Sequence, residues 1–249
     1  MEALCEDLRV LVTGASSGLG RAMAQALSDA GAQVVVTSRD VTRAKRTAEA
    51  MGKRALGVGL DVRDPGSINA AISSIEAYLG GIDLLVCNAG IGMRTVNPNF
   101  LTDPQPFWTV EADGFRNVFD TKVMGTFLVA RAIVPGMLER GSGRIVVISM
   151  NTETMSRKGF IPYGPSGAAV EAMAGVMIED LRESGVTVNI LLPGGATNTG
   201  MIPEGLDPSR RAQLLDPSIM GPPIVWLASA ASEGVHGRRI VATEFASLS

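Results

Sequence analysis

The chain has 249 residues and a formal net charge of -3, from 22 lysines and arginines against 25 aspartates and glutamates. Hydrophobic residues make up 46% of it and charged residues 19%, which excludes a disordered chain. The charge balance excludes a nucleic-acid binder that works through a broad basic face. This length suits one α/β unit, and we expect a single domain over residues 1–249.

Short β-branched runs alternate along the chain with longer stretches of helical spacing. The expected strands are Arg9–Thr13, Gln33–Thr37, Ala55–Leu60, Ile82–Cys87, Arg144–Ile148, Val186–Leu192 and Arg239–Ala242. The expected helices are Arg21–Ala30, Ile68–Leu79, Val123–Leu138 and Ala168–Leu181. Nearly continuous apolar strands are typical of strands covered on both faces. The alternation therefore predicts a doubly wound α/β fold with a mostly parallel, seven-stranded sheet and helices on both faces.

The residue types that form metal centres, disulfides and membrane spans are scarce or scattered. Cys5 and Cys87 are too few for a disulfide framework, which favours a reducing, cytoplasmic setting. One histidine, His236, and two distant cysteines make neither a zinc site nor a histidine-based triad. The N-terminus is acidic with no apolar leader after it, and no apolar run reaches the roughly 20 residues of a membrane span. We expect no metal and no membrane.

Two irregular stretches follow expected strands. Ile91–Asp113 comes after the fourth strand and Pro193–Pro223 after the sixth. Ligands of open α/β sheets bind at the carboxyl ends of strands, where these stretches begin. Long loops in a compact domain are usually functional, so we favour a binding role over surface decoration.

A glycine-rich turn joins the first strand to the first helix. It reads Thr13-Gly14-Ala15-Ser16-Ser17-Gly18-Leu19-Gly20. Gly14 permits a tight turn, Gly18 lets the backbone approach a pyrophosphate, and Gly20 lets the helix pack against the strand. The turn predicts a phosphate site at the helix N-terminus, formed by Gly14, Ser16, Ser17, Gly18, Leu19 and Gly20.

The spacing G-x-x-x-G-x-G after Thr13, with Asn88-Ala89-Gly90 after the fourth strand, resembles the short-chain dehydrogenase/reductase family of the classical type. Asp61-Val62 and Pro193-Gly194 extend the resemblance over nearly the whole chain. It implies a Rossmann domain with strand order 3-2-1-4-5-6-7, a nicotinamide cofactor, a small-molecule substrate, and a homodimer or homotetramer.

The resemblance also implies where the cofactor lies. Asp61 and Val62 would hold the adenine, and Asn88, Ala89 and Gly90 would line the ribose and nicotinamide. Thr197, in the loop that Pro193 and Gly194 begin, would meet the carboxamide.

The end of the second strand indicates the choice of cofactor. Ser38 stands where an NAD-binding member has a carboxylate for the ribose hydroxyl, and Arg39 follows. A hydroxyl and a guanidinium suit a 2′-phosphate, so we expect NADP(H) in preference to NAD(H). Asp40, one residue further on, is a carboxylate that could instead bind the ribose hydroxyl of NAD. The plainer alternative is that Arg39 is a solvated surface charge with no role in cofactor binding.

The catalytic positions depart from the family pattern of Asn, Ser, Tyr and Lys. Tyr163 matches the tyrosine, which acts as proton donor or acceptor. Four residues on, where the family has the lysine, stands Gly167. The serine position is Met150, so either a one-residue shift brings Ser149 or Asn151 into the serine role or the serine is lost. Lys122 replaces the asparagine.

Three accounts of these changes stay open. In the first, Lys122 compensates for Gly167 by entering the space that a side chain at 167 would fill. The chain is then an NADP(H)-dependent oxidoreductase that interconverts a small or medium apolar alcohol and carbonyl. In the second, Tyr163 and Lys122 catalyse a non-redox lyase or isomerase reaction. In the third, the chain is a catalytically silent cofactor-binding homologue.

Overall fold

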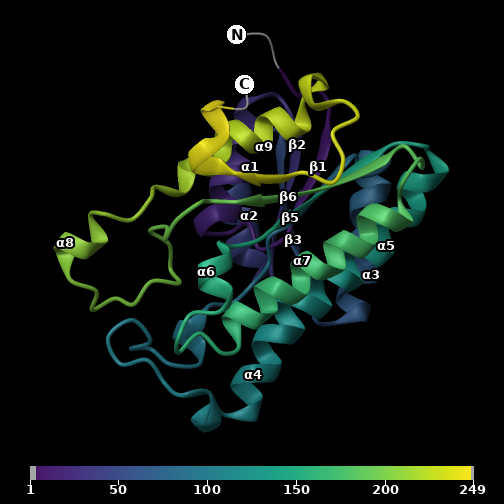
Figure 1. The fold of residues 1–249 in the computed structure, drawn as a ribbon. Helices are drawn as coiled ribbons and strands as arrows, with labels where there is room; N and C mark the ends of the chain where they lie inside the picture. The colour runs from purple at the N-terminus through teal and green to yellow at the C-terminus, as the bar shows by residue number, and fades with distance from the viewer. Residues whose placement is uncertain (1–3, 248–249) are drawn as a thin grey trace.

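Seven strands form one sheet in the order β3-β2-β1-β4-β5-β6-β7, and every neighbouring pair is parallel (Figure 1). The computed structural model describes residues 4–247, the side chains of residues 246 and 247 excepted. The strands are β1 Arg9–Val12, β2 Gln33–Ser38, β3 Ala55–Gly59, β4 Leu84–Cys87, β5 Gly143–Ile148, β6 Val186–Leu192 and β7 Arg239–Val241. The expected strands and their order are confirmed, and the sheet is wholly parallel. The ends of the expected domain, residues 1–3 and 248–249, lie outside the described residues.

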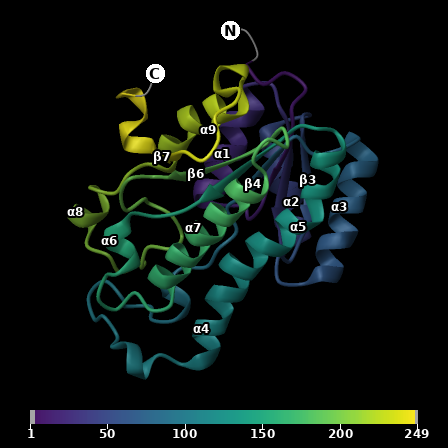
Figure 2. The same ribbon diagram turned by 45° about the vertical axis from the view of Figure 1, so that its right-hand side comes forward.

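Helices cover both faces of the sheet, as the turned view also shows (Figure 2). They are α1 Gly18–Asp29, α2 Val41–Met51, α3 Pro65–Leu79, α4 Ala112–Phe119, α5 Gly125–Glu139, α6 Thr152–Met155, α7 Tyr163–Asp180, α8 Pro208–Arg211 and α9 Gly221–Ala228. α3, α5 and α7 pack on one face, and α1, α2 and α9 on the other.

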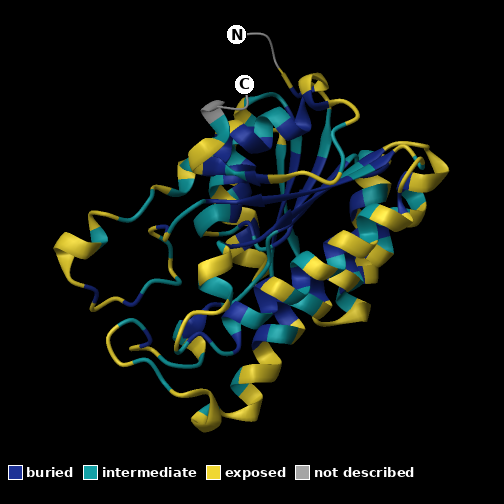
Figure 3. Ribbon diagram, in the orientation of Figure 1, coloured by how far each residue is buried: buried dark blue, intermediate teal, exposed yellow. Residues whose placement is uncertain are grey.

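The strands supply side chains to both cores because successive residues point to opposite faces. In β1, Leu11 belongs to the core under α3, α5 and α7, whereas Val10 and Val12 belong to the core under α1 and α9. All three are fully buried, and the strands form the buried centre of the molecule (Figure 3). Truncating Leu11 to alanine would cost about 2–5 kcal/mol.

The two ends of α3 follow local sequence rules, whereas the start of α1 does not. The Asp64 carboxylate accepts the Gly66 N–H at the start of α3, Pro65 takes the first position, and Gly80 in the left-handed conformation ends that helix. α1, by contrast, begins after Ser17 with no side-chain cap. Its first N–H groups are left for another partner.

The helix that contains Lys122 begins earlier in the chain than the sequence indicated. α4, a π-helical turn Asp120–Met124 and α5 form one continuous helix, Ala112–Glu139, whose apolar spacing we expected to begin only at Val123. Its length and composition alone would allow it to cross a membrane, although Lys122 and Arg131 interrupt its apolar residues. Its inward side chains, among them Ile133 and Met137, are fully buried in the domain core.

The two irregular stretches lie on the same side of the molecule, beyond the carboxyl ends of the strands (Figures 1 and 2). Arg94 in the first stretch reaches the second and forms an ion pair with Glu204 at 2.8 Å. The topology therefore brings both stretches to the end of the sheet where β1 meets the glycine turn.

Candidate active site and cofactor-binding site

The glycine turn has the backbone that a phosphate site requires. Gly14 and Gly18 have φ values of 64° and 56°, in the left-handed region that glycine adopts freely. A Cβ on Gly20 would lie 2.3 Å from Asn88 Nδ2, so the helix start can approach the strand ends only with glycine there. With the α1 N-terminus uncapped beside this turn, the residues fit a pyrophosphate.

Hydrogen bonds hold the segment after β4 against the glycine turn. The Thr13 hydroxyl oxygen accepts the N–H groups of Asn88 at 2.9 Å and Ala89 at 3.0 Å. Asn88 Nδ2 donates to the carbonyl oxygens of Thr13 and Gly14 at 2.9 and 3.1 Å. The Asn88 side chain therefore organises the turn, and Gly90 follows it half-buried.

The ends of β2 and β3 form the neighbouring part of the site. Asp40 is the N-cap of α2, and its carboxylate accepts the Arg43 N–H at 3.1 Å. The Ser38 hydroxyl oxygen accepts the Asp40 N–H at 3.3 Å. Arg39 is exposed, and within residues 4–247 its guanidinium makes no hydrogen bond or ion pair. The competing carboxylate is thus engaged in capping, whereas the guanidinium is available.

Arg63 is a charged neighbour of this region that the sequence reasoning missed. Its guanidinium donates to both carboxylate oxygens of Asp61, at 2.7 and 3.0 Å. These hydrogen bonds, with smaller help from the charge of Arg39, lower the pKa of Asp61. Val62 turns inward, and its Cγ2 lies 2.6 Å from where a Cβ on Gly125 would stand. Adenine binding by Asp61 and Val62 stays a prediction.

The loop after β6 folds back over the glycine turn. It leaves the buried Pro193 through Gly194, whose φ is 92° and whose carbonyl accepts Asn151 Nδ2 at 3.0 Å. Thr197 is buried, and its hydroxyl donates to the Gly195 carbonyl at 3.2 Å.

Thr199, which the sequence reasoning left out, lies over Gly18. Its Cγ2 is 3.3 Å from where a Cβ on Gly18 would stand. The signal was a second threonine two residues after Thr197 in the same loop.

Tyr163 begins α7 and is half-buried at the carboxyl end of the sheet. Its hydroxyl donates to Met201 Sδ at 3.8 Å, a weak bond to a soft acceptor. Burial raises the pKa of Tyr163. The phenol therefore keeps its proton at neutral pH and can donate it.

Lys122 lies next to Tyr163, on the π-helical turn. Its amine is 5.1 Å from the centroid of the Tyr163 ring, over the ring face, and the residue is only 8% exposed. Within residues 4–247 the amine of Lys122 makes no hydrogen bond or ion pair. Burial lowers its pKa from 10.5 to about 8, partly offset by the charge of Glu171. Single π-helical turns are frequent at functional sites.

Met150, not Lys122, fills the space beside Gly167. A Cβ on Gly167 would lie 2.7 Å from Met150 Cε and 2.8 Å from its Sδ. This corrects the idea that the Lys122 amine enters that space. The serine and lysine positions of the family are here occupied by a methionine and a glycine that pack directly on each other.

Ser149 is placed differently from the other two candidate catalytic residues. Its N–H donates to the Leu191 carbonyl at 3.0 Å as the pairing of β5 with β6 continues. Its hydroxyl is buried, and within residues 4–247 it has no hydrogen-bond partner. The structure brings Tyr163 and Lys122 together, and no hydrogen bond joins Ser149 to either.

Apolar side chains surround the outer side of Tyr163. The ring packs against a cluster of buried residues, Met93, Phe100 and Phe160. Met201 closes the site from the loop after β6, with its Cγ 3.0 Å from where a Cβ on Gly92 would stand. Among residues 4–247, no group of three or more histidine, cysteine, aspartate or glutamate side chains is placed to hold a metal.

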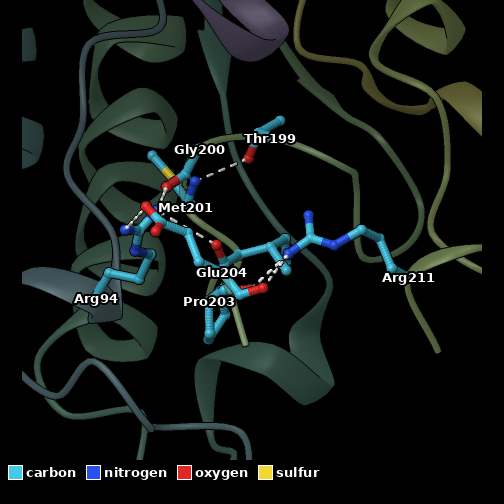
Figure 4. A network of polar contacts seen from close by, with 8 residues as sticks. Arg94, Thr199, Gly200, Met201, Pro203, Glu204 and Arg211 are labelled. Atoms are coloured by element: carbon cyan, nitrogen blue, oxygen red, sulfur yellow. Dashed lines mark hydrogen bonds and ion pairs between the residues drawn. The ribbon is translucent and has the colours of Figure 1, made fainter. Parts of the chain in front are cut away.

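Two arginines hold the loop that carries Met201 (Figure 4). Arg94 donates to the Gly200 carbonyl at 2.8 Å in addition to its ion pair with Glu204. Arg211 donates to the Pro203 carbonyl at 2.6 Å. Figure 4 shows both guanidinium groups converging on the Thr199–Glu204 segment, which fixes the position of Met201 beside the tyrosine.

This arrangement can protonate or deprotonate a small molecule next to a bound dinucleotide. Tyr163 supplies a proton, Lys122 a nearby cationic amine, and the apolar side chains a place for the reactant. The glycine turn and the uncapped helix supply the phosphate site.

The chain is similar to known oxidoreductases over nearly its whole length. It is 29% identical over 238 residues to the 3-oxoacyl-[acyl-carrier-protein] reductase of Vibrio cholerae, covering 92% of this chain and 93% of that protein. A gluconate 5-dehydrogenase of Burkholderia cenocepacia, in complex with NADP and tartrate, superposes with a TM-score of 0.85 at 27% identity over 99% of this chain and 98% of its own. A 3-ketoacyl-(acyl-carrier-protein) reductase of Brucella melitensis, complexed with NADH, superposes with a TM-score of 0.83 at 26% identity. That match covers 94% of this chain and 96% of the Brucella chain.

The family model for short chain dehydrogenases matches residues 9–207, which include the glycine turn, Lys122 and Tyr163. The matched region and the fully parallel sheet agree on one assignment. The chain belongs to the short-chain dehydrogenase/reductase family of nucleotide-binding oxidoreductases.

Proposed function

We propose that this protein is an NADP(H)-dependent oxidoreductase that interconverts a small or medium apolar alcohol and the corresponding carbonyl compound. The observation that carries the proposal is the Lys122 amine over the ring of Tyr163, 5.1 Å from its centroid. The pair retains a proton donor and an adjacent cation although the family lysine and serine are replaced.

Each side chain has a definite task in carbonyl reduction. A nicotinamide cofactor, when bound, would supply the hydride. Tyr163 donates its proton to the carbonyl oxygen as negative charge develops there. The positive charge of Lys122 stabilises the phenolate that results, since an opposite charge within a few ångströms favours the ionised form. Alcohol oxidation uses the same groups in reverse.

The preference for NADP(H) rests on the ends of β2 and α2. Arg39 has no partner within residues 4–247 and can bind a 2′-phosphate with two hydrogen bonds. Asp40, which would favour the ribose hydroxyl of NAD, is used as the cap of α2. Solved relatives hold either cofactor, NADP in the gluconate 5-dehydrogenase and NADH in the Brucella reductase.

The substrate class follows from the lining of the site. Met201 and the Met93, Phe100 and Phe160 cluster present apolar, adaptable surfaces beside Tyr163. The Lys122 amine lies over the ring of Tyr163, and we assign the Tyr163 hydroxyl as the hydrogen-bond donor to the substrate oxygen. These features suit a compound whose single polar group is the reacting oxygen.

We also propose a cytoplasmic homodimer or homotetramer. Large apolar side chains are exposed on the helix that runs from α4 into α5, namely Phe115, Met124 and Phe127. Exposed apolar side chains of this size suit a contact between subunits. Both cysteines are buried thiols, in keeping with a reducing compartment.

Titration with NADPH and NADH, followed by protein fluorescence, tests the cofactor, and absorbance at 340 nm then follows turnover with a panel of carbonyls. The panel should include apolar ketones and aldehydes, 3-oxoacyl thioesters and keto sugar acids. We expect tighter binding of NADPH and oxidation of NADPH by an apolar carbonyl. NADPH binding without hydride transfer to any member would favour the lyase or isomerase account, and binding of neither cofactor would overturn the proposal.

A further inference from the structure

A charged pair from α7 and β7 lies directly behind the altered catalytic centre. Tyr163, Gly167 and Glu171 follow one another at intervals of four residues on α7, so they share one face of that helix. Arg239 on β7 places its Nε 3.1 Å from both carboxylate oxygens of Glu171. Its Nη2 also donates to the Met150 carbonyl at 3.0 Å.

Arg239 therefore connects three elements at one point. It fixes the backbone of Met150, just after β5, to the face of α7 that carries Gly167. The Met150 thioether packs on Gly167, where the distances above place it. The methionine is 5% exposed, so this contact is part of the closed wall behind Tyr163.

The pair also sets the charge near Lys122. Of the groups on the elements packed against the π turn, Glu171 is the one whose charge acts on the Lys122 amine. Asp113 and Arg116 of α4 pair with each other in solvent, and Arg131 of α5 is exposed. Because Arg239 neutralises Glu171, the carboxylate exerts a weaker pull on the amine than it would alone.

We propose that Arg239 and Glu171 are positioning residues of the catalytic centre: Arg239 ties the backbone of Met150 to the face of α7 that carries Tyr163 and Gly167, and it balances the charge of Glu171 on that face. The inference rests on the proposed function, in which Lys122 assists Tyr163. It assigns a task to β7, which lies beyond the region matched by the family model.

Two substitutions should move the titration of Lys122 in opposite directions. Glu171→Gln removes the negative charge and leaves Arg239 unbalanced, so the pKa of Lys122 should fall. Arg239→Gln removes the positive charge and leaves Glu171 unbalanced, so that pKa should rise. A purely structural role would not separate the two variants in sign. Arg239→Lys should return the titration to that of the wild type.

The titration can be measured without turnover. Trace acetylation with acetic anhydride, quantified by mass spectrometry of the Lys122 peptide from pH 6 to 11, reports the fraction of neutral amine. The pH dependence of kcat/KM with NADPH provides a second readout. Glu179→Gln is the matched control, because Glu179 is on the same helix and forms a solvent-exposed ion pair with Arg182.

We expect the midpoint of labelling to move down in Glu171→Gln and up in Arg239→Gln, each changing the neutral fraction at pH 7.5 by about two- to fivefold, with no change in Glu179→Gln. Shifts of the same sign, or none in variants that keep the wild-type circular dichroism spectrum, would overturn the inference. If the labelling shifts as expected but no variant or wild-type protein turns over a carbonyl, the charge relation stands and the proposed oxidoreductase function fails.

Discussion

Adding one methyl group at position 167 tests how the altered catalytic centre is packed. The Cβ of Gly167→Ala would lie 2.7 and 2.8 Å from Met150 Cε and Sδ, well inside the roughly 3.5–4.0 Å of a favourable carbon contact. Overpacking of this kind costs about 1–3 kcal/mol. Replacing a helical glycine by alanine stabilises by about 1 kcal/mol. The free energy of unfolding should therefore fall by up to about 2 kcal/mol.

The same substitution should have the opposite effect once the methionine is shortened. In a Met150→Ala background the clashing atoms are gone, so Gly167→Ala should stabilise by about 1 kcal/mol. The coupling between the two positions is then about 1–3 kcal/mol. Gly175→Ala on the same helix is the matched control, because its Cβ meets no atom within 4 Å. It should stabilise by about 1 kcal/mol in both backgrounds.

Urea unfolding followed by far-ultraviolet circular dichroism measures all of these values, provided that the m-values agree among variants. The coupling is read as the difference between the effects of Gly167→Ala in the two backgrounds. If that difference is below about 0.5 kcal/mol, the side chain of Met150 does not occupy the space beside Gly167 and the reasoning is refuted.

Three further predictions concern the cofactor and the catalytic pair. Lys122→Met should raise the free energy of unfolding at pH 7 by about 1–3 kcal/mol, because folding then no longer buries a charged amine. That gain in unfolding free energy is full below pH about 8, where Lys122 is protonated in both the folded and the unfolded state, and it disappears as the pH approaches 10.5. Urea unfolding across this pH range measures the gain, and a gain that grew with pH would contradict the account. Arg39→Ala should weaken NADPH binding by about tenfold or more and NADH binding far less, whereas Asp40→Ala should lower stability by about 1 kcal/mol and leave the ratio of the two dissociation constants unchanged. Tyr163→Phe should retain NADPH binding and lose turnover; activity within about threefold of wild type would exclude the phenol as the proton donor.

The fold could be read from the sequence because its signals are local and repeated. The run Val10–Val12 is apolar at every position, which only a strand covered on both faces requires. The glycines of the phosphate turn stand where the backbone is left-handed, at Gly14 and Gly18, or where the helix start lies close to Asn88, at Gly20. The start of the helix before Lys122 was missed because residues 112–119 are mostly exposed, and Val118 is the one buried residue among them.

The catalytic centre could be read only in part. The replacement of the family lysine and serine was visible as Gly167 and Met150, but which side chain fills the vacated space depends on a rotamer. The methionine is flexible and unbranched, so its direction leaves no mark in the sequence. The contact between Arg239 and Glu171 joins residues 68 positions apart and was equally invisible.

The effect of Lys122→Asn on kcat/KM for NADPH-linked carbonyl reduction tests the central claim most directly. The substitution restores the family residue at this position while removing the cation beside Tyr163. We predict a fall of about 10²–10⁴-fold, the size of the contribution made by assisted proton transfer. Retention of kcat/KM within about threefold would show that Tyr163 works without the amine, and would contradict the assignment of Lys122.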